Sequence, residues 1–364
     1  MSSREAAMAT TIGDNAVVID YDDDFIRAGY AVPEREPGVL QPALVRPAGS
    51  GAGGETSRLI RDRRVEDWDQ LEALLADVFY RQCAWVKGDE GACLITEPMF
   101  TSKADRERLT QMMFESFNVS GLYVAEQPVA ALYAVGKVTG VSVDVGYSVT
   151  DVAPVVEGSL VSPAAQRCEA GHSLITAELL ARCGEEHRRL REHERDAVRD
   201  ATAAVAPSRA DDASGDAPLK DETYTLPDGR KVSVPGAARR ECVERGLFRP
   251  IGRAGLVDAA AASIAACPAE QRRAVVDAVG VCGAWAGRTE GLDARILADL
   301  EQQLPPSMKP FLASTPEYMP AGTARWAPWI GGAILSKVVF THNQHVTKVE
   351  YQETGPSVAA KLKG

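Results

Sequence analysis

Four aspartates near the start of the chain are the residues best placed to do chemistry. Asp20 ends the apolar stretch 15–19, and Asp22, Asp23 and Asp24 follow it closely. Clustered carboxylates can hold a hard cation, and each one that faces a polyanion costs about 1–4 kcal/mol at effective dielectrics of 80 to 20. The stretch lacks the glycine and glutamate spacing of a calcium loop, so we favour a solvated acidic turn over a metal site.

A fifth aspartate, Asp144, has surroundings that match those of Asp20. Each of the two ends an apolar strand and is followed by a tight turn and a return strand, over 25–32 in the first copy and 149–156 in the second. Such turns bind anions when small residues let backbone N–H groups converge on the ligand. Two similar hairpins about 124 residues apart predict a duplicated lobe.

Histidines and cysteines give no metal-site pattern. His342 and His345 have no third ligand nearby, so we interpret them as ordinary surface or interface residues. The seven cysteines are scattered, odd in number and without a C-x-x-C pair. We therefore expect neither a zinc site nor a disulfide framework, and a reducing compartment.

Composition limits the classes of function. The 364 residues, 45% of them hydrophobic, can bury the core of one two-lobed unit or of two domains. A net charge of −11 argues against direct binding to nucleic acid. No window approaches eighteen apolar residues, and the first residues lack a charged head followed by an apolar run, so we expect a soluble intracellular protein without membrane contact.

Alternating strand and helix patterns favour an α/β fold with a mixed sheet. The helix at 65–80 has an apolar stripe and a cap at Asp67, and the helix at 103–117 buries Met112 and Met113. The expected elements are strands at 15–19, 25–32, 122–124 and 141–145, helices at 65–80, 103–117, 128–135 and 332–339, a hairpin at 224–234, and a charged, solvated helix at 185–203.

Six blocks carry a more specific signal: 94–98, 112–119, 123–127, 143–146, 329–332 and 351–357. Their identity, order and spacing resemble actin and the actin-related proteins over roughly 16–360. The resemblance implies an actin-like ATPase fold, with two duplicated lobes around a central cleft where the two hairpins clamp the phosphates of ATP. It divides the chain into a disordered N-terminus (1–13), a small lobe (14–126, with an abridged insertion at 46–64), a large lobe (127–327, with a disordered insertion at about 205–220) and a return to the small lobe (328–364).

The resemblance also places a nucleotide site. The positions that match nucleotide-contacting residues are Asp20, Arg27, Asp144, Gly146, Gly283 and Arg325, and Gln127 matches the glutamine that orients the attacking water. Asp20, Gln127 and Asp144 are therefore the vestigial catalytic residues, which can equally serve as structural caps and hydrogen-bonding groups.

Several departures weaken that site. Asp22, Asp23 and Asp24 replace a glycine- and serine-rich loop, Tyr147 replaces a carboxylate of the metal shell, Ser148 replaces a glycine and Asp151 replaces a histidine near the attacking water. Trp285 puts bulk in the turn where the base lies. Arg191 and Glu192 match a Lys-Glu pair only loosely. We expect no catalysis, no resident metal and no required cofactor, with ATP and Mg²⁺ binding left open.

Assembly and function follow from the same resemblance. Only residues 47–64 are available for the subdomain that in actin inserts into the next subunit of a filament, and the first half of this stretch is a flexible glycine-rich tract, 48–54. The subdomain is therefore abridged, and we expect no self-filament. The blocks 96–98, 117–121, 126–127, 132–136, 316–320 and 343–348 resemble the plant-type nuclear actin-related proteins of SWI/SNF-type chromatin-remodelling complexes. That family implies a non-catalytic structural subunit.

The implied partners are a helix of the remodelling ATPase and actin or a second actin-related protein. The helix would lie in a groove near 134–138 and 344–351. We expect a nuclear protein, with a cytoplasmic pool left open, and no direct contact with nucleic acid. Two alternatives remain: an ATP-binding actin-like switch, and a cytoplasmic or axonemal actin-related adaptor.

Overall fold

The computed structural model describes residues 15–45, 57–205 and 219–362. The expected disordered N-terminus, the glycine-rich tract 48–54 and most of the insertion at 205–220 lie outside these residues. The chain forms two compact units, which are described separately. The first unit comprises residues up to 138, 157–160 and those from 314 onward, and the second comprises 139–156 and 161–313.

These boundaries differ from the sequence-based division after 126 and 327. The reason is that α4 (Gln127–Ala134) and α13 (Ala327–Thr341) pack tightly against each other inside the first unit. A Cβ atom on Gly331 would lie 1.6 Å from the carbonyl oxygen of Ala130. Because Gly331 has no side chain, α4 can approach α13 this closely. The sequence predicted a glycine turn before a helix at 332–339, but Gly331 lies inside α13.

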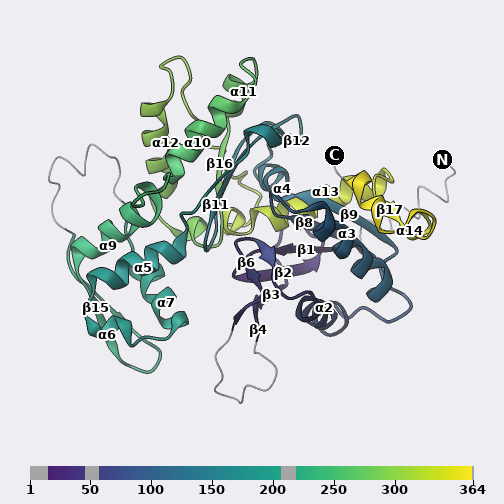
Figure 1. Cartoon of the computed structure of the whole chain (residues 1–364), viewed down its shortest axis with the longest axis horizontal. Helices are drawn as coiled ribbons and strands as arrows, with labels where there is room; N and C mark the ends of the chain where they lie inside the picture. The colour runs from purple at the N-terminus through teal and green to yellow at the C-terminus, as the bar shows by residue number, and fades with distance from the viewer. Residues whose placement is uncertain (1–14, 46–56, 206–218, 363–364) are drawn as a thin grey trace. The chain divides into compact units, whose positions relative to one another are not determined.

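A six-stranded mixed sheet forms the centre of the first unit (Figure 1). Its order is β17 (Val346–Thr347), β9 (Gly121–Glu126), β8 (Ala92–Glu97), β1 (Val17–Tyr21), β2 (Phe25–Tyr30) and β3 (Val39–Pro42). Strands β1, β8 and β9 are parallel, and the other pairings are antiparallel. The predicted strands at 15–19, 25–32 and 122–124 are confirmed with shifted ends.

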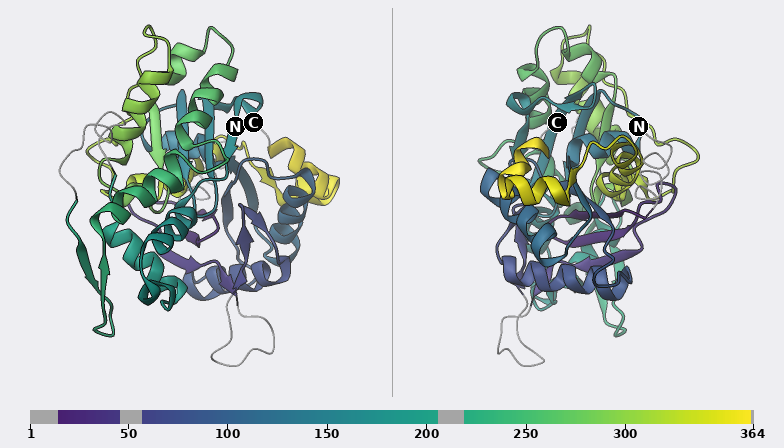
Figure 2. Two further views of the ribbon diagram at one scale, coloured as in Figure 1. Left: turned by 60° about the vertical axis from the view of Figure 1, so that its left-hand side comes forward. Right: turned by 90° about the vertical axis from the view of Figure 1, so that its right-hand side faces the viewer.

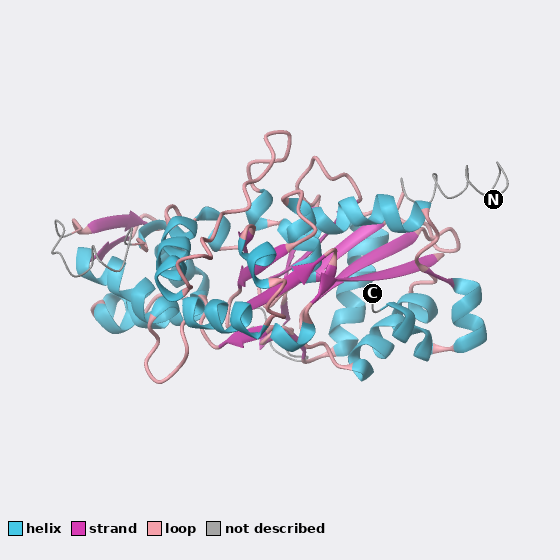
Figure 3. Ribbon diagram, turned by 90° about the horizontal axis from the view of Figure 1, so that it is seen from above, coloured by secondary structure: helices cyan, strands magenta, loops and turns pink. Residues whose placement is uncertain are grey.

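Both faces of this sheet are covered by helices, as Figure 3 shows. Val17 and Ile19 share a buried cluster with residues of α2 (Trp68–Asp77) and α3 (Lys103–Gln111). Val18 points to the opposite face, where its methyl group would lie 3.0 Å from a Cβ on Gly332 of α13. Successive strand residues face opposite sides, so a strand covered on both sides is apolar throughout.

The two helices predicted at 65–80 and 103–117 are confirmed. The Asp67 side chain accepts hydrogen bonds from two backbone N–H groups in the first turn of α2. Each helix continues into a π-helical turn, and Met112 and Met113 are buried. The remaining elements of the first unit are β4 (Leu44–Val45), β5 (Ser57–Arg58), β6 (Ile60–Arg61), β7 (Arg64–Val65), β12 (Ser159–Leu160), α14 (Lys348–Thr354) and short helices at Thr323–Arg325 and Pro356–Leu362.

The second unit repeats the central motif of the first. Strands β10 (Gly140–Val145) and β11 (Thr150–Val156) form an antiparallel hairpin, and β16 (Val279–Cys282) adds parallel to β10. This matches the arrangement of β1, β2 and β8. Asp20 pairs in register with Arg27, and Asp144 pairs with Asp151 at the equivalent place. The predicted duplication is therefore present in the strand pairing.

Helices and a second hairpin complete the second unit. They are β13 (Gln166–Cys168), α5 (His172–Arg182), α6 (Glu185–Arg188), α7 (Glu192–Thr202), β14 (Glu222–Thr225), β15 (Lys231–Val234), α9 (Gly236–Val243), α10 (Leu256–Ala266), α11 (Arg272–Val276), α12 (Leu292–Gln303), and short helices at Ser162–Ala164 and Ala286–Arg288. Hairpin β14–β15, the teal pair in Figure 2, confirms the prediction at 224–234.

The expected single solvated helix at 185–203 is wrong. The chain breaks between α6 and α7, and α7 has a buried face. Arg199 is buried because its guanidinium pairs with Asp196 and Asp200 and also reaches Thr176 of α5. A charge-dense helix can have a buried face when its charged side chains form ion pairs with one another.

The seven cysteines are all buried as free thiols. No helix within 15–45, 57–205 or 219–362 is long and apolar enough to cross a membrane.

His345 is buried within the first unit, whereas the sequence predicted a surface or interface residue. Its ring lies 5.0 Å from that of Phe340, and a Cβ on Gly121 would come within 2.6 Å of it. Burial lowers the pKa of His345, although the Val339 carbonyl and Glu350 oppose the shift. His342, by contrast, is exposed.

We expect the stability of the first unit to fall as the pH drops below about 6.5, the ordinary pKa of histidine. Below that pH the unfolded chain binds a proton that the buried His345 ring resists, so stability rises with pH across this window. The substitution His345→Phe should flatten the dependence of the urea midpoint on pH between 5.5 and 7.5. His342→Phe is the control, and an equal flattening in both variants would contradict the assignment.

Candidate functional site

Asp20 lies at the end of β1 and is 1% exposed. Its carboxylate accepts hydrogen bonds from Arg27 Nη1 at 2.8 Å and from Thr96 Oγ1 at 2.6 Å. Gln127 Nε2 donates a third, at 2.9 Å. The carboxylate is thus held by groups from β2, β8 and α4, all within the first unit.

Gln127 is engaged at both ends of its amide. Its Nε2 donates to Asp20 and, at 2.8 Å, to the backbone carbonyl of Tyr21. Its Oε1 accepts from Arg63 Nη1 at 3.0 Å. A side-chain amide has two N–H donors and one carbonyl acceptor. Both N–H groups and the oxygen of Gln127 are therefore directed at the protein itself.

Arg63 comes from the turn between β6 and β7, where Asp62 and Arg63 have φ of 50° and 62°. This turn lies against the acidic loop, because the Arg63 backbone N–H donates to Asp23 Oδ1 at 2.7 Å. Arg63 and Asp23 are both buried. Arg63, a residue of the abridged insertion 46–64, therefore donates the hydrogen bond that Gln127 accepts.

The acidic loop is not solvated, which corrects the expectation from the sequence. Asp23 is 2% exposed, and the Asp24 carboxylate pairs with Arg58 Nη1 at 2.9 Å. One oxygen of Asp22 accepts from the backbone N–H groups of Asp24 and Phe25, and the other pairs with Arg27. Arg27 of β2 therefore neutralises Asp22, and Arg58 of β5 neutralises Asp24.

Arg58 and Arg63 were missed by sequence reasoning. The signal was the charge complementarity between three consecutive aspartates, 22–24, and the arginine-rich stretch 58–64. This complementarity predicts that aspartates and arginines of the two stretches pair, but it does not predict which pairs form.

Arg27 joins this network to an aromatic ring. Burial alone would lower the pKa of Arg27, but Asp22 and Asp20 raise it above its ordinary value. Burial raises the pKa of Asp20, and Arg27 and Thr96 oppose that shift. The Arg27 guanidinium lies 5.4 Å from the centre of the Trp326 ring, and that of Arg325 lies 3.8 Å from it. Arg325, which matches a nucleotide-contacting residue of the family, thus stacks on the Trp326 ring.

The second hairpin carries its own half of the predicted site, in the second unit. The Gly146 carbonyl accepts from the His172 backbone N–H at 3.1 Å, which fastens the turn to the start of α5. The Tyr147 hydroxyl donates to Glu192 Oε1 at 3.1 Å, and its ring meets the His172 ring edge-on. The loosely matched Glu192 thus contacts the residue that replaces the metal-shell carboxylate.

Asp151 is also paired inside its unit. Its two carboxylate oxygens accept from Arg167 Nε at 2.6 Å and Nη2 at 2.8 Å, across the pairing of β11 with β13. Asp151 and Arg27 occupy equivalent places in the two hairpins. In both hairpins, the residue paired in register with the strand-end aspartate, Asp20 or Asp144, belongs to an arginine–carboxylate pair.

Gly283 and Asp144 meet at the end of β10. Gly283 has φ of 122°, and a Cβ there would lie 2.2 Å from the Val145 carbonyl and 3.2 Å from an oxygen of Asp144. Trp285 is buried in the core cluster of the second unit, which also contains Leu292. The Trp285 indole therefore packs into the core, whereas the sequence-based expectation placed its bulk in the turn where the base lies.

The chain is similar to proteins of one known family. The family model described as actin matches residues 13–191 and 183–363. The chain belongs to the actin family. It is 37% identical over 367 residues to actin-related protein 7 of Oryza sativa, in both subspecies indica and japonica, covering 95% of this chain and 99% of each relative. It is 34% identical over 368 residues to actin-related protein 7 of Arabidopsis thaliana, covering 94% and 98%.

The actin-family assignment confirms the predicted fold class and the relationship to actin-related proteins. Members of this family usually bind a nucleotide with Mg²⁺. Here Asp20, Arg27 and Gln127 are brought together in one network of the first unit, and Arg325 joins it through Trp326. Asp144 and Gly283 meet in the second unit. The first-unit residues fit a reacting triphosphate poorly, because their polar atoms already bind one another.

Proposed function

We propose that this actin-related protein is a non-catalytic structural subunit of a nuclear chromatin-remodelling complex. The observation that carries the non-catalytic part is the engagement of Gln127 at both ends of its amide. A general base or water-positioning group must reach the attacking water by a hydrogen bond of about 2.6–3.2 Å. Both N–H donors of Gln127 are used by Asp20 and Tyr21. An attacking water would therefore have to share Oε1 with the Arg63 guanidinium or displace one of these bonds.

Releasing Gln127 would leave buried polar groups without partners. Each such loss costs about 1–3 kcal/mol, and more where the group is charged. The acidic loop adds repulsion toward phosphate wherever its arginine pairs do not cancel it. The first hairpin is thus stabilised by its own ion pairs in place of a nucleotide.

We expect the purified chain to show no turnover of radiolabelled ATP above a protein-free blank. We also expect 1 mM ATP with Mg²⁺ to raise the melting temperature by less than about 1 °C, since a ligand stabilises only as far as it binds the folded state. Actin treated identically is the positive control. Steady turnover that is lost in Gln127→Ala would contradict this proposal and favour the ATP-binding switch.

ATP binding without hydrolysis is a second candidate, favoured by one observation. Gly146 and Gly283 are retained, and Gly283 has a backbone conformation and a close contact that exclude other residues. Equilibrium dialysis with a non-hydrolysable ATP analogue separates this candidate from a pure scaffold. Saturation with lost affinity in Asp144→Asn would support it.

The partner surface we propose lies in the first unit. Three valines near the segments 134–138 and 344–351 have exposed side chains: Val138, Val338 and Val349. An amphipathic helix recognises such apolar residues by laying its own apolar face against them. A helix of the remodelling ATPase is the occupant implied by the family resemblance of block 343–348.

The test is recovery of that ATPase on the tagged chain. Val349 is 63% exposed, so Val349→Asp should leave the fold intact and reduce co-purification at least about tenfold. Val86, 67% exposed in the same unit, supplies the matched control Val86→Asp. Equal recovery with the two variants would exclude this surface.

A further inference from the structure

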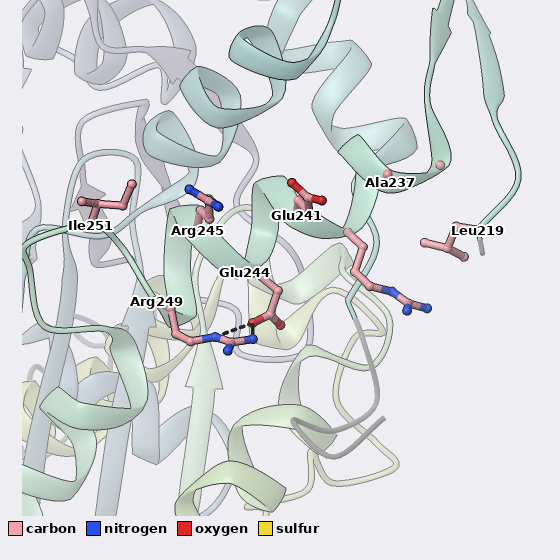
Figure 4. A pocket seen from close by; sticks show the side chains of 9 residues that line it. Leu219, Ala237, Glu241, Glu244, Arg245, Arg249 and Ile251 are labelled. Carbon is pink, nitrogen blue, oxygen red and sulfur yellow. Dashed lines mark hydrogen bonds and ion pairs between the residues drawn. The ribbon is translucent and has the colours of Figure 1, made fainter. Parts of the chain in front are cut away.

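A cavity of about 590 Å³ opens on the second unit, along one side of α9 and the π-helical turn Glu244–Phe248 that continues it (Figure 4). We call it the α9 trough. Its lining residues are Leu219, Gly236, Ala237, Arg240, Glu241, Glu244, Arg245, Arg249 and Ile251. None of them belongs to the two hairpins of the candidate nucleotide site, so the trough is a separate feature.

Both glutamates of the α9 trough are already neutralised. Glu244 accepts from Arg295 Nη1 at 2.6 Å and from Arg249 Nη2 at 2.8 Å. Glu241 accepts from Arg182 Nε at 2.8 Å. Figure 4 shows the contact between Glu244 and Arg249. The acidic side chains therefore cancel against arginines on their own and neighbouring helices.

Two arginines of the trough, Arg240 and Arg245, have no carboxylate partner among the described residues. Within the described part of the chain, the guanidinium groups of Arg240 and Arg245 make no hydrogen bond or ion pair. Arg240 Nε is buried and has no hydrogen-bond partner there. A buried N–H without an acceptor is costly, so an incoming carboxylate oxygen would remove that cost. The trough is thus locally basic on a chain of net charge −11.

The ends of the α9 trough are apolar. Figure 4 places Leu219 at one end and Ile251 at the other, with the helix between them. Ile251 is 75% exposed. From Ala237 to Arg249 a helix advances about 18 Å at 1.5 Å per residue. An extended peptide covers that length with about five or six residues, whereas a compact small molecule would reach only one end.

We propose that the α9 trough binds an extended acidic segment of a partner protein. Two carboxylates of the segment pair with Arg240 and Arg245, and an aliphatic side chain packs on Ile251 or Leu219. The length of the trough and its apolar ends favour a peptide, and the two arginines select a negative charge. This site is independent of the proposed remodelling function.

The test uses fluorescence anisotropy with the full chain and a labelled probe of sequence Leu-Glu-Asp-Glu-Asp-Leu. A second probe, Leu-Gln-Asn-Gln-Asn-Leu, has the same shape without charge. We expect saturable binding of the acidic probe only, which weakens as salt rises. The double variant Arg240→Gln/Arg245→Gln should weaken it about tenfold. Arg273→Gln, at an exposed arginine of the same unit, should change it less than about twofold.

Three outcomes of these measurements would overturn the proposal, and a further variant would do so separately. They are equal binding of the two probes, unchanged affinity in the double variant, and no saturation by the acidic probe at about 1 mM. The chain itself carries Asp211, Asp212 and Asp216 close to Leu219 in sequence. Binding that appears only after these three are changed to Asn would assign the trough to the chain's own acidic segment and reject a partner peptide.

Discussion

Replacing Arg27 with methionine is expected to lower the free energy of unfolding of the first unit by about 3–5 kcal/mol. Arg27 pairs with Asp20 and Asp22, and Asp20 is almost fully buried. Methionine fills a similar volume but supplies no charge, so the buried carboxylates lose their partner. The loss exceeds that of a surface pair because water cannot reach Asp20.

Tryptophan fluorescence during urea unfolding suits this measurement. Four of the five tryptophans lie in the first unit, and Trp326 touches Arg27 itself. The control is Arg81→Met, which removes an exposed pair with Asp77 and should cost less than about 1 kcal/mol. Similar losses in the two variants would show that the network around Asp20 contributes little.

The second large effect is expected at Gly331, where alanine should destabilise the first unit by about 3 kcal/mol or more. The new Cβ would lie 1.6 Å from the carbonyl oxygen of Ala130, so the backbones of α4 and α13 must separate. Gly332→Ala is the matched control in the same helix. The three atoms nearest to its Cβ would be side-chain atoms of Thr96, Val18 and Leu94, at 3.0–3.1 Å, which need to shift by only a few tenths of an ångström.

Both substitutions gain about 1 kcal/mol in helix propensity, because alanine replaces glycine in each. The difference in stability between the two variants therefore reports the packing of α4 against α13. Separation of α4 from α13 would also displace 134–138, which begins at the last residue of α4. We therefore expect Gly331→Ala to lose the remodelling ATPase in co-purification at temperatures where Gly332→Ala retains it. Equal melting temperatures for the two variants would contradict the close approach seen here.

The sequence predicted the local elements of the fold because their signals are local. Apolar runs that end at Asp20 and Asp144 marked the two hairpins, and the cap at Asp67 marked the start of α2. The duplication was visible for the same reason, since both copies keep strand, aspartate and turn in one order. The family resemblance then supplied the relation between these pieces.

Long-range pairing could not be read in the same way. Arg63 reaches Gln127 and Asp23 across 64 and 40 positions, and nothing in the sequence selects it over Arg61 or Arg64. The orientation of Trp285 depends on space left by the second-unit core, and the burial of His345 depends on Gly121, which is far along the chain. Sequence patterns give the charges and apolar residues but not the partners they find.

The central claim is best tested by identifying what the chain assembles with. The tagged protein is purified from native nuclear and cytosolic extracts in moderate salt, treated with nuclease to remove bridging nucleic acid, and its stoichiometric partners are identified by mass spectrometry. We predict a SWI/SNF-type ATPase together with actin or a second actin-related protein in the nuclear fraction. Recovery of cytoskeletal or motor subunits without a remodelling ATPase would contradict the proposal and favour the adaptor alternative.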